Sequence, residues 1–300
     1  MDKRHSGSIL LWLLVVGLAA FILFNMVSGT NLKGLFKLPV GVNKIAPYEK
    51  TPAGPVPIVA DTLPQQPTPI GFSSAQLSPY YKQVRIDSVI RPDRNAYYNA
   101  GGQFAIYADR SMKQPVDVTG WSVRGNKSGS VFIPRAVSDY TPNTFGTPQN
   151  TNIMLESGGR VYVYGSQSTL GKNFRLNKCM GYLNENYKFD PSLPNECPRI
   201  DSGRLALLSG KCQDFVRSMN TCATPKPDDF NRISGFVEDE CRVLINKQNH
   251  ISCYNDNYNS ANFFSKEWRT WNSDPMTFDT YHDRLVLFDK QGLVVDEYTY

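Results

Sequence analysis

The sequence predicts a mainly β protein: a β-sandwich with a disulfide-rich helical insertion, preceded by one N-terminal transmembrane helix. Three features lead to this prediction, namely short apolar segments separated by turns, six cysteines in the C-terminal half, and an uncharged run near the N-terminus. A chain with 41% hydrophobic and 20% charged residues can bury a core, which argues against disorder or a coiled coil. Its 16 Tyr, 16 Phe, 22 Gly and 20 Pro favour short strands and many turns.

The uncharged run covers residues 9–27 and reads ILLWLLVVGLAAFILFNMV. At about 1.5 Å per helical residue it just spans a hydrocarbon core of roughly 30 Å. A cleaved signal peptide is the alternative. The run is longer than the usual apolar region of about 7–15 residues, however, and Val27-Ser28-Gly29 is a poor cleavage site. We therefore expect an uncleaved membrane anchor behind a cytoplasmic tip, residues 1–8.

The charges and the cysteines together predict the orientation of this anchor. Lys3 and Arg4 precede the run and favour a cytoplasmic N-terminus, whereas Lys33 and Lys37 beyond it weaken the bias. All six cysteines lie on the C-terminal side of the run, and an even set in one region suits an oxidising compartment. The sequence thus predicts a single-pass protein of the cell membrane with an extracytoplasmic C-terminal domain.

A proline-rich segment follows the anchor. Nine prolines stand between residues 39 and 79, and such a density excludes a helix or a central strand. We expect residues 28–79 to form a semi-rigid stalk that extends by about 3.1 Å per residue. The stalk would carry the following domain, residues 80–300, away from the bilayer.

The β segments begin near Tyr81. Leu285–Phe288 and Leu293–Val295 flank the turn Asp289-Lys290-Gln291-Gly292, a pattern that predicts a hairpin with Gly at positive φ. Short strands spaced by turns are typical of a β-sandwich. The other expected strands lie at Val84–Val89, Phe104–Tyr107, Val116–Trp121 around Gly120, Val131–Ile133, Ile153–Leu155 and Val161–Tyr164.

Between about residues 205 and 272 the spacing of apolar residues changes to the three- and four-residue spacing of helices. We expect the helical insertion there. Phe264 and Trp268, at i and i+4, suggest a third, shorter helix near Ala261–Trp271. Pro225 and Pro227 separate the first two helices. One helical face contains Cys212, Phe215, Val216, Met219 and Cys222, and a second contains Ile233, Phe236, Val237, Cys241, Leu244 and Ile245.

The cysteines are expected to form disulfides rather than a zinc site, because no Cys-x-x-Cys pair is present. Cys212, Cys222, Cys241 and Cys253 belong to the helical region. If its first two helices form an antiparallel hairpin, the first of these four cysteines meets the last, and the second meets the third. This reasoning predicts Cys212–Cys253 and Cys222–Cys241 and leaves Cys179–Cys197 to close the loop Met180–Glu196. Shuffled pairing, or free buried thiols in a reducing compartment, is the alternative.

Three motifs in the β segments carry a resemblance. They are Val116-Asp117-Val118-Thr119-Gly120-Trp121, the run from Ile153 to Ser166 through Gly158-Gly159, and the closing segment Asp283–Asp296. These segments, in this order, resemble the lamin-tail domain, an immunoglobulin-like β-sandwich that also occurs in bacterial envelope and secreted proteins. The likeness covers residues 82–184 and 282–300. It implies an immunoglobulin-like fold but only a loose analogy of function, since one sandwich fold hosts many roles.

The search for catalytic, cofactor or metal sites gives none. Beyond the tip the histidines are His250 and His282, and neither a His-Glu-x-x-His nor a Gly-x-Ser-x-Gly motif occurs. Gly165–Asn173 is similar to a phosphate-binding loop but has one residue too many, so we interpret it as a turn at a strand end. A glycosidase with two carboxylates stays open but has no support in the sequence.

A calcium loop is the remaining candidate metal site. Residues 255–259 (NDNYN) place oxygen ligands at alternate positions. The pattern lacks the glycine at loop position six, where Ser260 stands, and the glutamate at position twelve, where Lys266 stands. We therefore expect an ordinary polar loop and predict no metal and no cofactor.

Three tryptophans have two interpretations each. Trp121 follows a tight turn and is expected in the core, the alternative being a platform on which a ligand stacks. Trp268 and Trp271 are expected to dock the helical insertion on the sandwich, the alternative being a surface binding patch.

These features predict a non-catalytic, membrane-anchored, extracytoplasmic binding or structural module of the cell envelope. Its partner would be a protein or a cell-surface polymer. Residues 1–75 contribute +3 of the net charge of +5, so the rest is nearly neutral and argues against nucleic acid. The alternative is an envelope enzyme or a nuclease-associated accessory domain, suggested by the company that lamin-tail domains keep in other bacterial proteins.

Overall fold

The computed structural model describes residues 67–93, 95, 100–126, 129–141, 149–232 and 239–300. The chain divides into two compact units, Met1–Leu63 and Pro64–Tyr300, and all described residues belong to the second. The predicted tip, the predicted transmembrane helix and most of the predicted stalk lie outside the described residues. Among the helices that are described, none combines the length and the apolar character needed to cross a bilayer.

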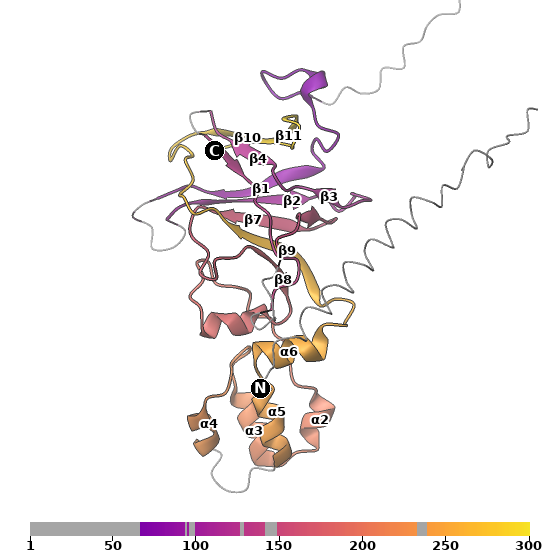
Figure 1. Ribbon diagram of the computed structural model, residues 1–300, viewed down its shortest axis with the longest axis vertical. Coiled ribbons are helices and arrows are strands. Elements are labelled where there is room, and N and C mark those ends of the chain that lie inside the picture. The colour runs from indigo at the N-terminus through magenta and orange to yellow at the C-terminus, as the bar shows by residue number, and fades with distance from the viewer. Residues whose placement is uncertain (1–66, 94, 96–99, 127–128, 142–148, 233–238) are drawn as a thin grey trace, which may run out of the picture. The chain divides into compact units, whose positions relative to one another are not determined.

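The described part of the chain is mainly β, as predicted, and contains three sheets (Figure 1). All neighbouring strands pair antiparallel except β7 and β9, which run parallel. The five-stranded sheet has the order β1 (Val84–Ile90), β2 (Gln103–Ala108), β7 (Arg160–Tyr164), β9 (Phe264–Trp271) and β8 (Phe174–Asn177). The four-stranded sheet has the order β11 (Val294–Thr299), β10 (Arg284–Phe288), β4 (Ser122–Arg124) and β5 (Ser130–Phe132), and the third pairs β3 (Val116–Asp117) with β6 (Met154–Leu155).

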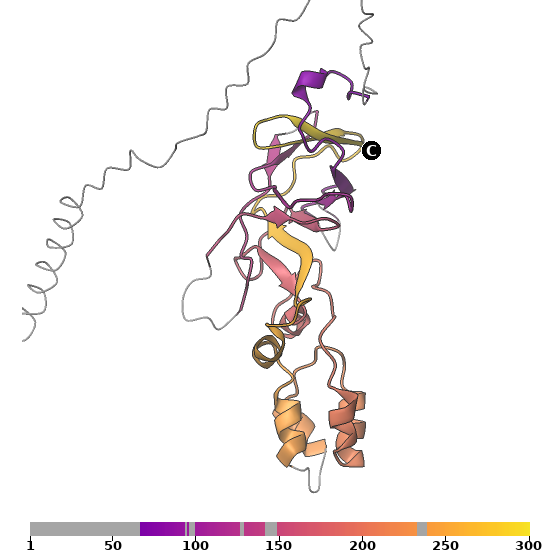
Figure 2. The same cartoon turned by 90° about the vertical axis from the view of Figure 1, so that its right-hand side faces the viewer.

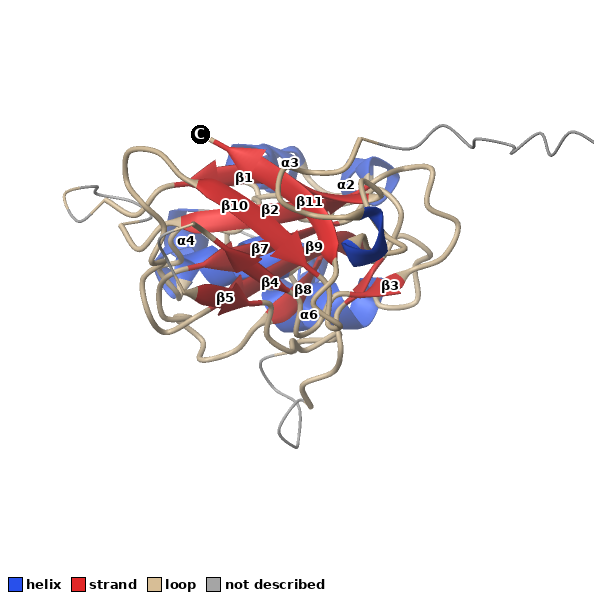
Figure 3. Cartoon of the chain, turned by 90° about the horizontal axis from the view of Figure 1, so that it is seen from above, coloured by secondary structure: helices blue, strands red, loops and turns tan. Residues whose placement is uncertain are grey.

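The two larger sheets share one hydrophobic core. Figure 3 shows β10 and β11 crossing over β1 and β2. Alternation along the strands fills the core, since Val84 and Ile86 of β1 are buried whereas Arg85 and Asp87 between them are exposed. Trp121 is 2% exposed in this core, so its interpretation as a core residue is confirmed. The other large members include Phe104, Ile106, Val161, Val163, Trp268, Leu285 and Leu287.

Buried aspartates hold the closing hairpin in place. Asp289 Oδ1 accepts hydrogen bonds from the backbone N–H groups of Gln291 and Leu293, and Gly292 has φ +82°. The predicted hairpin and its glycine turn are therefore confirmed. Asp296 ties the hairpin to β1, because it accepts from the Ile86 N–H at 2.8 Å and from Lys82 Nζ at 2.7 Å.

The segment Val116–Trp121 is held in the same way. Asp117 Oδ1 accepts from the Thr119 N–H, and its Oδ2 accepts from Asn152 Nδ2 at 2.8 Å. Thr119 Oγ1 accepts from the Ile153 N–H at 2.7 Å, and Gly120 has φ +80°. The polar residues of this motif therefore join two chain segments, which makes their role structural.

Apart from the short 3-10 helix η1 (Ser74–Gln76), the described helices gather beyond the β8 edge of the five-stranded sheet (Figures 1 and 2). They are the 3-10 helix η2 (Met180–Glu185) and α2 (Ser202–Ala206), α3 (Gly210–Ser218), α4 (Pro227–Arg232), α5 (Asp239–Asn246) and α6 (His250–Asn257). The first predicted helix is confirmed in α3, although Met219 and Cys222 lie beyond its end. The second is confirmed in α5 from Cys241 to Ile245, and the residues expected to begin it lie outside the described part.

The predicted third helix is wrong, because Phe264–Trp271 forms β9. A spacing of four residues puts Phe264 and Trp268 on one face of a helix, but it also puts them on one face of a strand. A spacing of three distinguishes a helix from a strand, because residues three apart share a face in a helix and lie on opposite faces of a strand. Trp268 packs in the core between the larger sheets, whereas Trp271 packs in a second cluster on the other face. Both tryptophans are buried in a strand, so neither predicted role for them holds.

The structure pairs the cysteines as Cys179–Cys253, Cys197–Cys222 and Cys212–Cys241, and none is free. The expectation of disulfides is confirmed, but all three predicted pairs are wrong. The assumed hairpin of two long helices does not exist, because α3 ends at Ser218 and Cys253 lies on a separate helix, α6. Cys212 therefore joins α3 directly to α5, and α6 packs against η2, next to Cys179.

Residues 67–79, which the sequence assigns to the stalk, pack along the β10–β11 hairpin. The Ser78 N–H donates to the Val294 carbonyl at 2.8 Å, and Tyr81 Oη donates to the Pro67 carbonyl at 3.1 Å. Phe72 and Leu77 contact the small cluster of Tyr81, Val286 and Val294. The compact domain thus includes the end of the proline-rich segment.

The Cys212–Cys241 bridge gives a test of the corrected pairing. The double substitution Cys212→Ser and Cys241→Ser should lower the stability of the helical region by about 2–4 kcal/mol, because the bridge restricts the unfolded chain. Hydrogen exchange should show faster exchange in α3 and α5 and unchanged protection in β2 and β7. Equal protection of α3 in both proteins, or recovery of a Cys212–Cys253 peptide from the native protein, would contradict the pairing.

Candidate ligand-binding pocket

The second face of the five-stranded sheet carries polar and aromatic side chains. Because β7 and β9 run parallel, Arg160 lies opposite Glu267, Tyr162 opposite Arg269, and Tyr164 opposite Trp271. These residues alternate with Val161, Val163 and Trp268, which point into the shared core. The parallel register therefore brings a carboxylate, two guanidiniums and two phenols together on one face.

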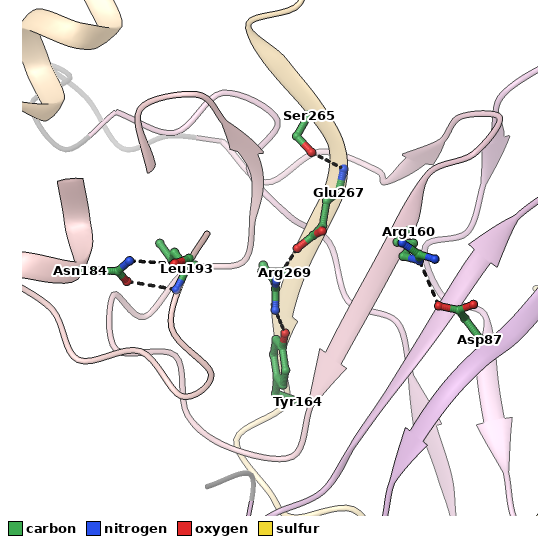
Figure 4. Close-up of polar contacts among 8 residues, drawn as sticks. All are labelled: Asp87, Arg160, Tyr164, Asn184, Leu193, Ser265, Glu267 and Arg269. Atoms are coloured by element: carbon green, nitrogen blue, oxygen red, sulfur yellow. Dashed lines mark hydrogen bonds and ion pairs between the residues drawn. The ribbon is translucent and has the colours of Figure 1, made fainter. Parts of the chain in front are cut away.

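Arg269 is the centre of this group (Figure 4). It is 9% exposed, and its Nη2 lies 2.5 Å from Glu267 Oε1. Its Nη1 donates to Tyr164 Oη, and its guanidinium carbon lies 4.3 Å from the centroid of the Tyr162 ring. An ion pair, a phenol and a cation–π contact thus hold this buried charge in place.

The burial of this pair shifts its proton equilibria. Burial raises the pKa of Glu267 to about 7, and the Glu196 carboxylate adds to the rise, whereas the Arg160 guanidinium opposes it. The adjacent Arg269 guanidinium also favours the ionised carboxylate, and burial lowers the pKa of Arg269 to about 10. Burial and the Arg269 guanidinium thus act on the pKa of Glu267 in opposite directions.

Glu267 lines a cavity of about 280 Å³ between the end of β8, the turn after it, the loop before Cys197 and the start of β9. One part of the wall is apolar and consists of Leu176, Met180, Pro194 and Phe263. The other part is polar and consists of Asn177, Lys178, Glu196, Asn262, Ser265 and Glu267.

Two side chains of the polar wall are largely buried. Asn177 is 6% exposed; its Oδ1 accepts from the Cys179 N–H, but its buried Nδ2 finds no acceptor among the described residues. Glu267 Oε1 is also buried and lies 2.5 Å from Arg269 Nη2. A buried polar atom without a partner, such as Asn177 Nδ2, is uncommon in native proteins.

Disulfides and a pair of amide contacts brace the wall. Cys179, two residues after Asn177, is bonded to Cys253 of α6, and Cys197, next to Glu196, is bonded to Cys222. Figure 4 shows Asn184 exchanging two hydrogen bonds with the backbone of Leu193, at 2.8 and 3.0 Å. The loop that carries Glu196 is thus fixed at both ends.

The structure also places the candidates that the sequence singled out. Gly165–Asn173 connects β7 to β8 through turns, with Gly171 at φ +62°, so its interpretation as a strand-end turn is confirmed. The expected polar loop at residues 255–259 is wrong in part, because Asn255–Asn257 end α6. Within the described ranges no group of three or more His, Cys, Asp or Glu side chains could hold a metal ion.

The two histidines lie apart from the cavity. His250 is buried at the start of α6, and burial lowers its pKa to about 4. His282 is exposed next to the carbonyl of Tyr300. Neither lines the cavity, so the site contains no imidazole base among its described residues.

Sequence reasoning did not find Asn177 or Glu267. For Glu267 a signal existed, because charged Glu267 and Arg269 flank Trp268 in a segment rich in aromatic residues, as in a strand with one polar face. For Asn177 there was no signal, since its environment depends on the fold of a distant segment. The chain matches no protein-family model, no curated protein and no solved structure.

The pKa of Glu267 predicts a pH dependence of stability. Between the ordinary value of 4.5 and about 7, the folded protein keeps a proton that the unfolded chain has released, so the free energy of unfolding falls as the pH rises and then levels off. The total change should be at most about 3 kcal/mol, because the Arg269 guanidinium at 2.5 Å stabilises the ionised carboxylate.

Urea unfolding between pH 4 and pH 8 measures this effect. Glu267→Gln should flatten the curve between pH 4.5 and 7, whatever its absolute stability, because Gln has no proton to release. Glu240→Gln, a change at an exposed position on α5, serves as the control and should leave the curve as it is. Parallel curves for the native protein and Glu267→Gln would contradict the raised pKa.

Proposed function

We propose that the protein is a membrane-anchored module of the cell envelope whose extracytoplasmic domain binds a ligand without catalysing a reaction. Residues 9–27 would form the single membrane span, with the N-terminus in the cytoplasm, and the following segment would form the stalk. The three disulfides support this location, because such bonds persist in oxidising compartments outside the cytoplasm.

We further propose that the domain is an immunoglobulin-like β-sandwich of the lamin-tail type, with the helices inserted before its last hairpin. Two observations support this: the two larger sheets share one core, and the segments that carry the resemblance form the turns and strands that close it. In those segments Asp117, Thr119, Asp289 and Asp296 bind backbone groups. They are structural residues, so the ligand site has to be sought elsewhere.

The observation that carries the binding function is the braced cavity beside Glu267. Apolar and polar residues line it together, the usual make-up of a ligand site. Glu196 and Asn262 at its rim are exposed, so their side chains can reach a ligand. The partner would be a protein or a cell-surface polymer, and the near-neutral charge of the domain argues against nucleic acid.

One observation favours the alternative, an envelope enzyme. Glu196 and Glu267 line the same cavity, and burial raises the pKa of Glu267 to about 7. A hydrolase with two carboxylates uses a carboxylic acid with a raised pKa as its proton donor. The contact with Arg269 counts against this role, because a guanidinium 2.5 Å away favours the ionised carboxylate over the acid.

The proposed topology has a direct test. Ser74 lies exposed in the short 3-10 helix η1 (Ser74–Gln76), and all six native cysteines are in disulfides, so Ser74→Cys adds the one reactive thiol. A membrane-impermeant maleimide should label this variant on intact cells and leave the native protein unlabelled. Labelling only after cell lysis would contradict the proposed orientation, in which the C-terminal domain lies outside the cytoplasm.

The binding function predicts that the full-length protein, reconstituted in phospholipid nanodiscs, sediments with isolated cell-envelope material. Glu196→Ala at the exposed rim of the cavity should reduce the bound fraction several-fold, because a charge-assisted hydrogen bond contributes about 1.5–3 kcal/mol. Glu240→Ala, an exposed position away from the cavity, should bind as the native protein does. If the native protein instead released soluble fragments from the envelope material, and the Glu267→Gln variant did not, the result would favour the enzyme.

A further inference from the structure

We propose that a second cavity, in the helical region, binds a small organic acid that carries one carboxylate on a short apolar chain. This site goes beyond the proposed function, because none of its lining residues lines the cavity beside Glu267. Its volume is about 400 Å³, within the roughly 300–1,000 Å³ of sites for small molecules. It lies between the segment after Cys197, the end of α3 and the residues around Cys222.

The Cys197–Cys222 disulfide holds the walls of this cavity together. The Cα atoms of the two cysteines lie 5.3 Å apart. Arg199 follows Cys197 by two residues, and on the other wall Asn220 and Thr221 directly precede Cys222. Two residues of chain span at most about 7 Å, so the covalent link limits how far these polar side chains can separate.

The polar groups of this cavity are accessible to a ligand. Arg199, Asn220 and Thr221 are exposed, and no described residue forms an ion pair or a hydrogen bond with their side chains. By contrast, Tyr182 Oη donates to Gln248 Oε1 at 3.2 Å, so these two residues belong to the wall. A guanidinium, an amide and a hydroxyl can all donate, as a carboxylate ligand requires.

The charge of the cavity selects a single negative charge. Among the described residues that line it, Arg199 and Arg217 are charged and none is a carboxylate. Arg217 already has partners on α3, because its Nη2 donates to Gln213 Oε1 at 3.0 Å and its Nη1 lies 3.7 Å from Asp214 Oδ1. Arg199 has no such partner, so one positive charge is left over, and a monoanion matches it better than a phosphate dianion.

A smaller adjoining cavity of about 170 Å³ does not change this balance. Arg199 lines it too, together with Asp201 and Asp256. Asp201 Oδ1 accepts from the Arg204 N–H at the start of α2, and Asp256 Oδ2 lies 3.8 Å from Lys247 Nζ. Because Arg204 and Lys247 line the same smaller cavity, its two acidic residues meet two basic residues besides Arg199.

The apolar part of the lining is also within reach of a ligand. Five apolar residues line the larger cavity and are partly exposed, namely Pro198, Ile200, Val216, Met219 and Ala223. Methyl or methylene groups of a ligand can contact them and leave water. Inorganic phosphate has no apolar group to place there, and a neutral apolar molecule leaves Arg199 without a partner. An acid with a short hydrocarbon chain uses both parts of the lining.

The test is a titration of the full-length protein in phosphatidylcholine nanodiscs, measured by saturation-transfer NMR with empty nanodiscs as the blank. The probes are acetate, propanoate, butanoate and isovalerate, with isovaleramide as the neutral analogue and inorganic phosphate as a competitor. Isovalerate should bind with a Kd in the millimolar range. Affinity should rise about two- to fourfold with each methylene from acetate to butanoate, because each one is buried against the apolar lining.

Variants then locate the carboxylate. Arg199→Gln should weaken isovalerate about tenfold, because it removes a charge-assisted hydrogen bond. Arg242→Gln makes the same change of charge at an exposed position of α5 outside the cavity and should leave the Kd unchanged. Glu196→Ala, at the rim of the cavity beside Glu267, should also bind isovalerate as the native protein does, so a failure at one site is distinguished from a failure at the other.

Acetylglycylleucine, which has a free C-terminal carboxylate, presents the same two groups on a peptide. Binding at least as tight as that of isovalerate identifies a chain terminus as the source, and weaker binding identifies a free acid. The proposal is overturned if no acid binds, if isovaleramide binds as well as isovalerate, if phosphate displaces isovalerate, or if Arg199→Gln binds as the native protein does. The probe series uses the native protein, so it decides the matter whether or not a variant folds.

Discussion

The pairing of β9 between β7 and β8 is the constraint on which the rest of the domain depends. This one strand contributes Trp268 to the core between the two larger sheets and Trp271 to the cluster on the other face, where its ring centroid lies 5.4 Å from those of Tyr164 and Phe174. It also carries Glu267 and Arg269 on that second face. If β9 slipped by one residue, every one of these side chains would change face, so both clusters and the ion pair specify one register.

The buried ion pair belongs to this strand because the sheet gives it partners. A guanidinium that is 9% exposed would be expensive without them, and Arg269 finds a carboxylate from its own strand and phenols from the neighbouring parallel strand. The same burial keeps Glu267 from being an ordinary surface carboxylate. The chemistry of the cavity thus follows from strand order, and the disulfides add the rigid wall opposite.

The sequence predicted those features that depend on short stretches of chain. The closing hairpin, the strands β1, β2 and β7, the core position of Trp121 and the helical character around Cys212 and Cys241 all follow from local alternation, turn residues and helical period. The strand β9 was mistaken for a helix because Phe264 and Trp268 fit both periods. The disulfide pairs were wrong because the ends of α3 and α5, and hence which cysteines share a helix, are set by tertiary contacts.

The cavity itself was beyond sequence reasoning. Its wall comes from residues 176–180, 194–196 and 262–267, and neither the separation of these segments nor their types form a pattern along the chain. In the motifs that were visible in the sequence, such as Val116–Trp121, polar side chains accept hydrogen bonds from backbone N–H groups and stabilise turns. Conspicuous motifs here mark the places where the chain must be held, whereas the candidate site consists of residues that are unremarkable one by one.

The helical insertion leaves and re-enters the sheet at one point, because the Lys178 N–H donates to the Phe263 carbonyl at 3.1 Å where β8 ends and β9 approaches. The entropic cost of closing such a segment grows only slowly with its length, by about 0.6 kcal/mol for each doubling. The β8–β9 connection is therefore a place where the chain can accept a change of length at little cost in stability. A longer or shorter helical segment would alter the rim of the cavity and leave the strand pairing in place.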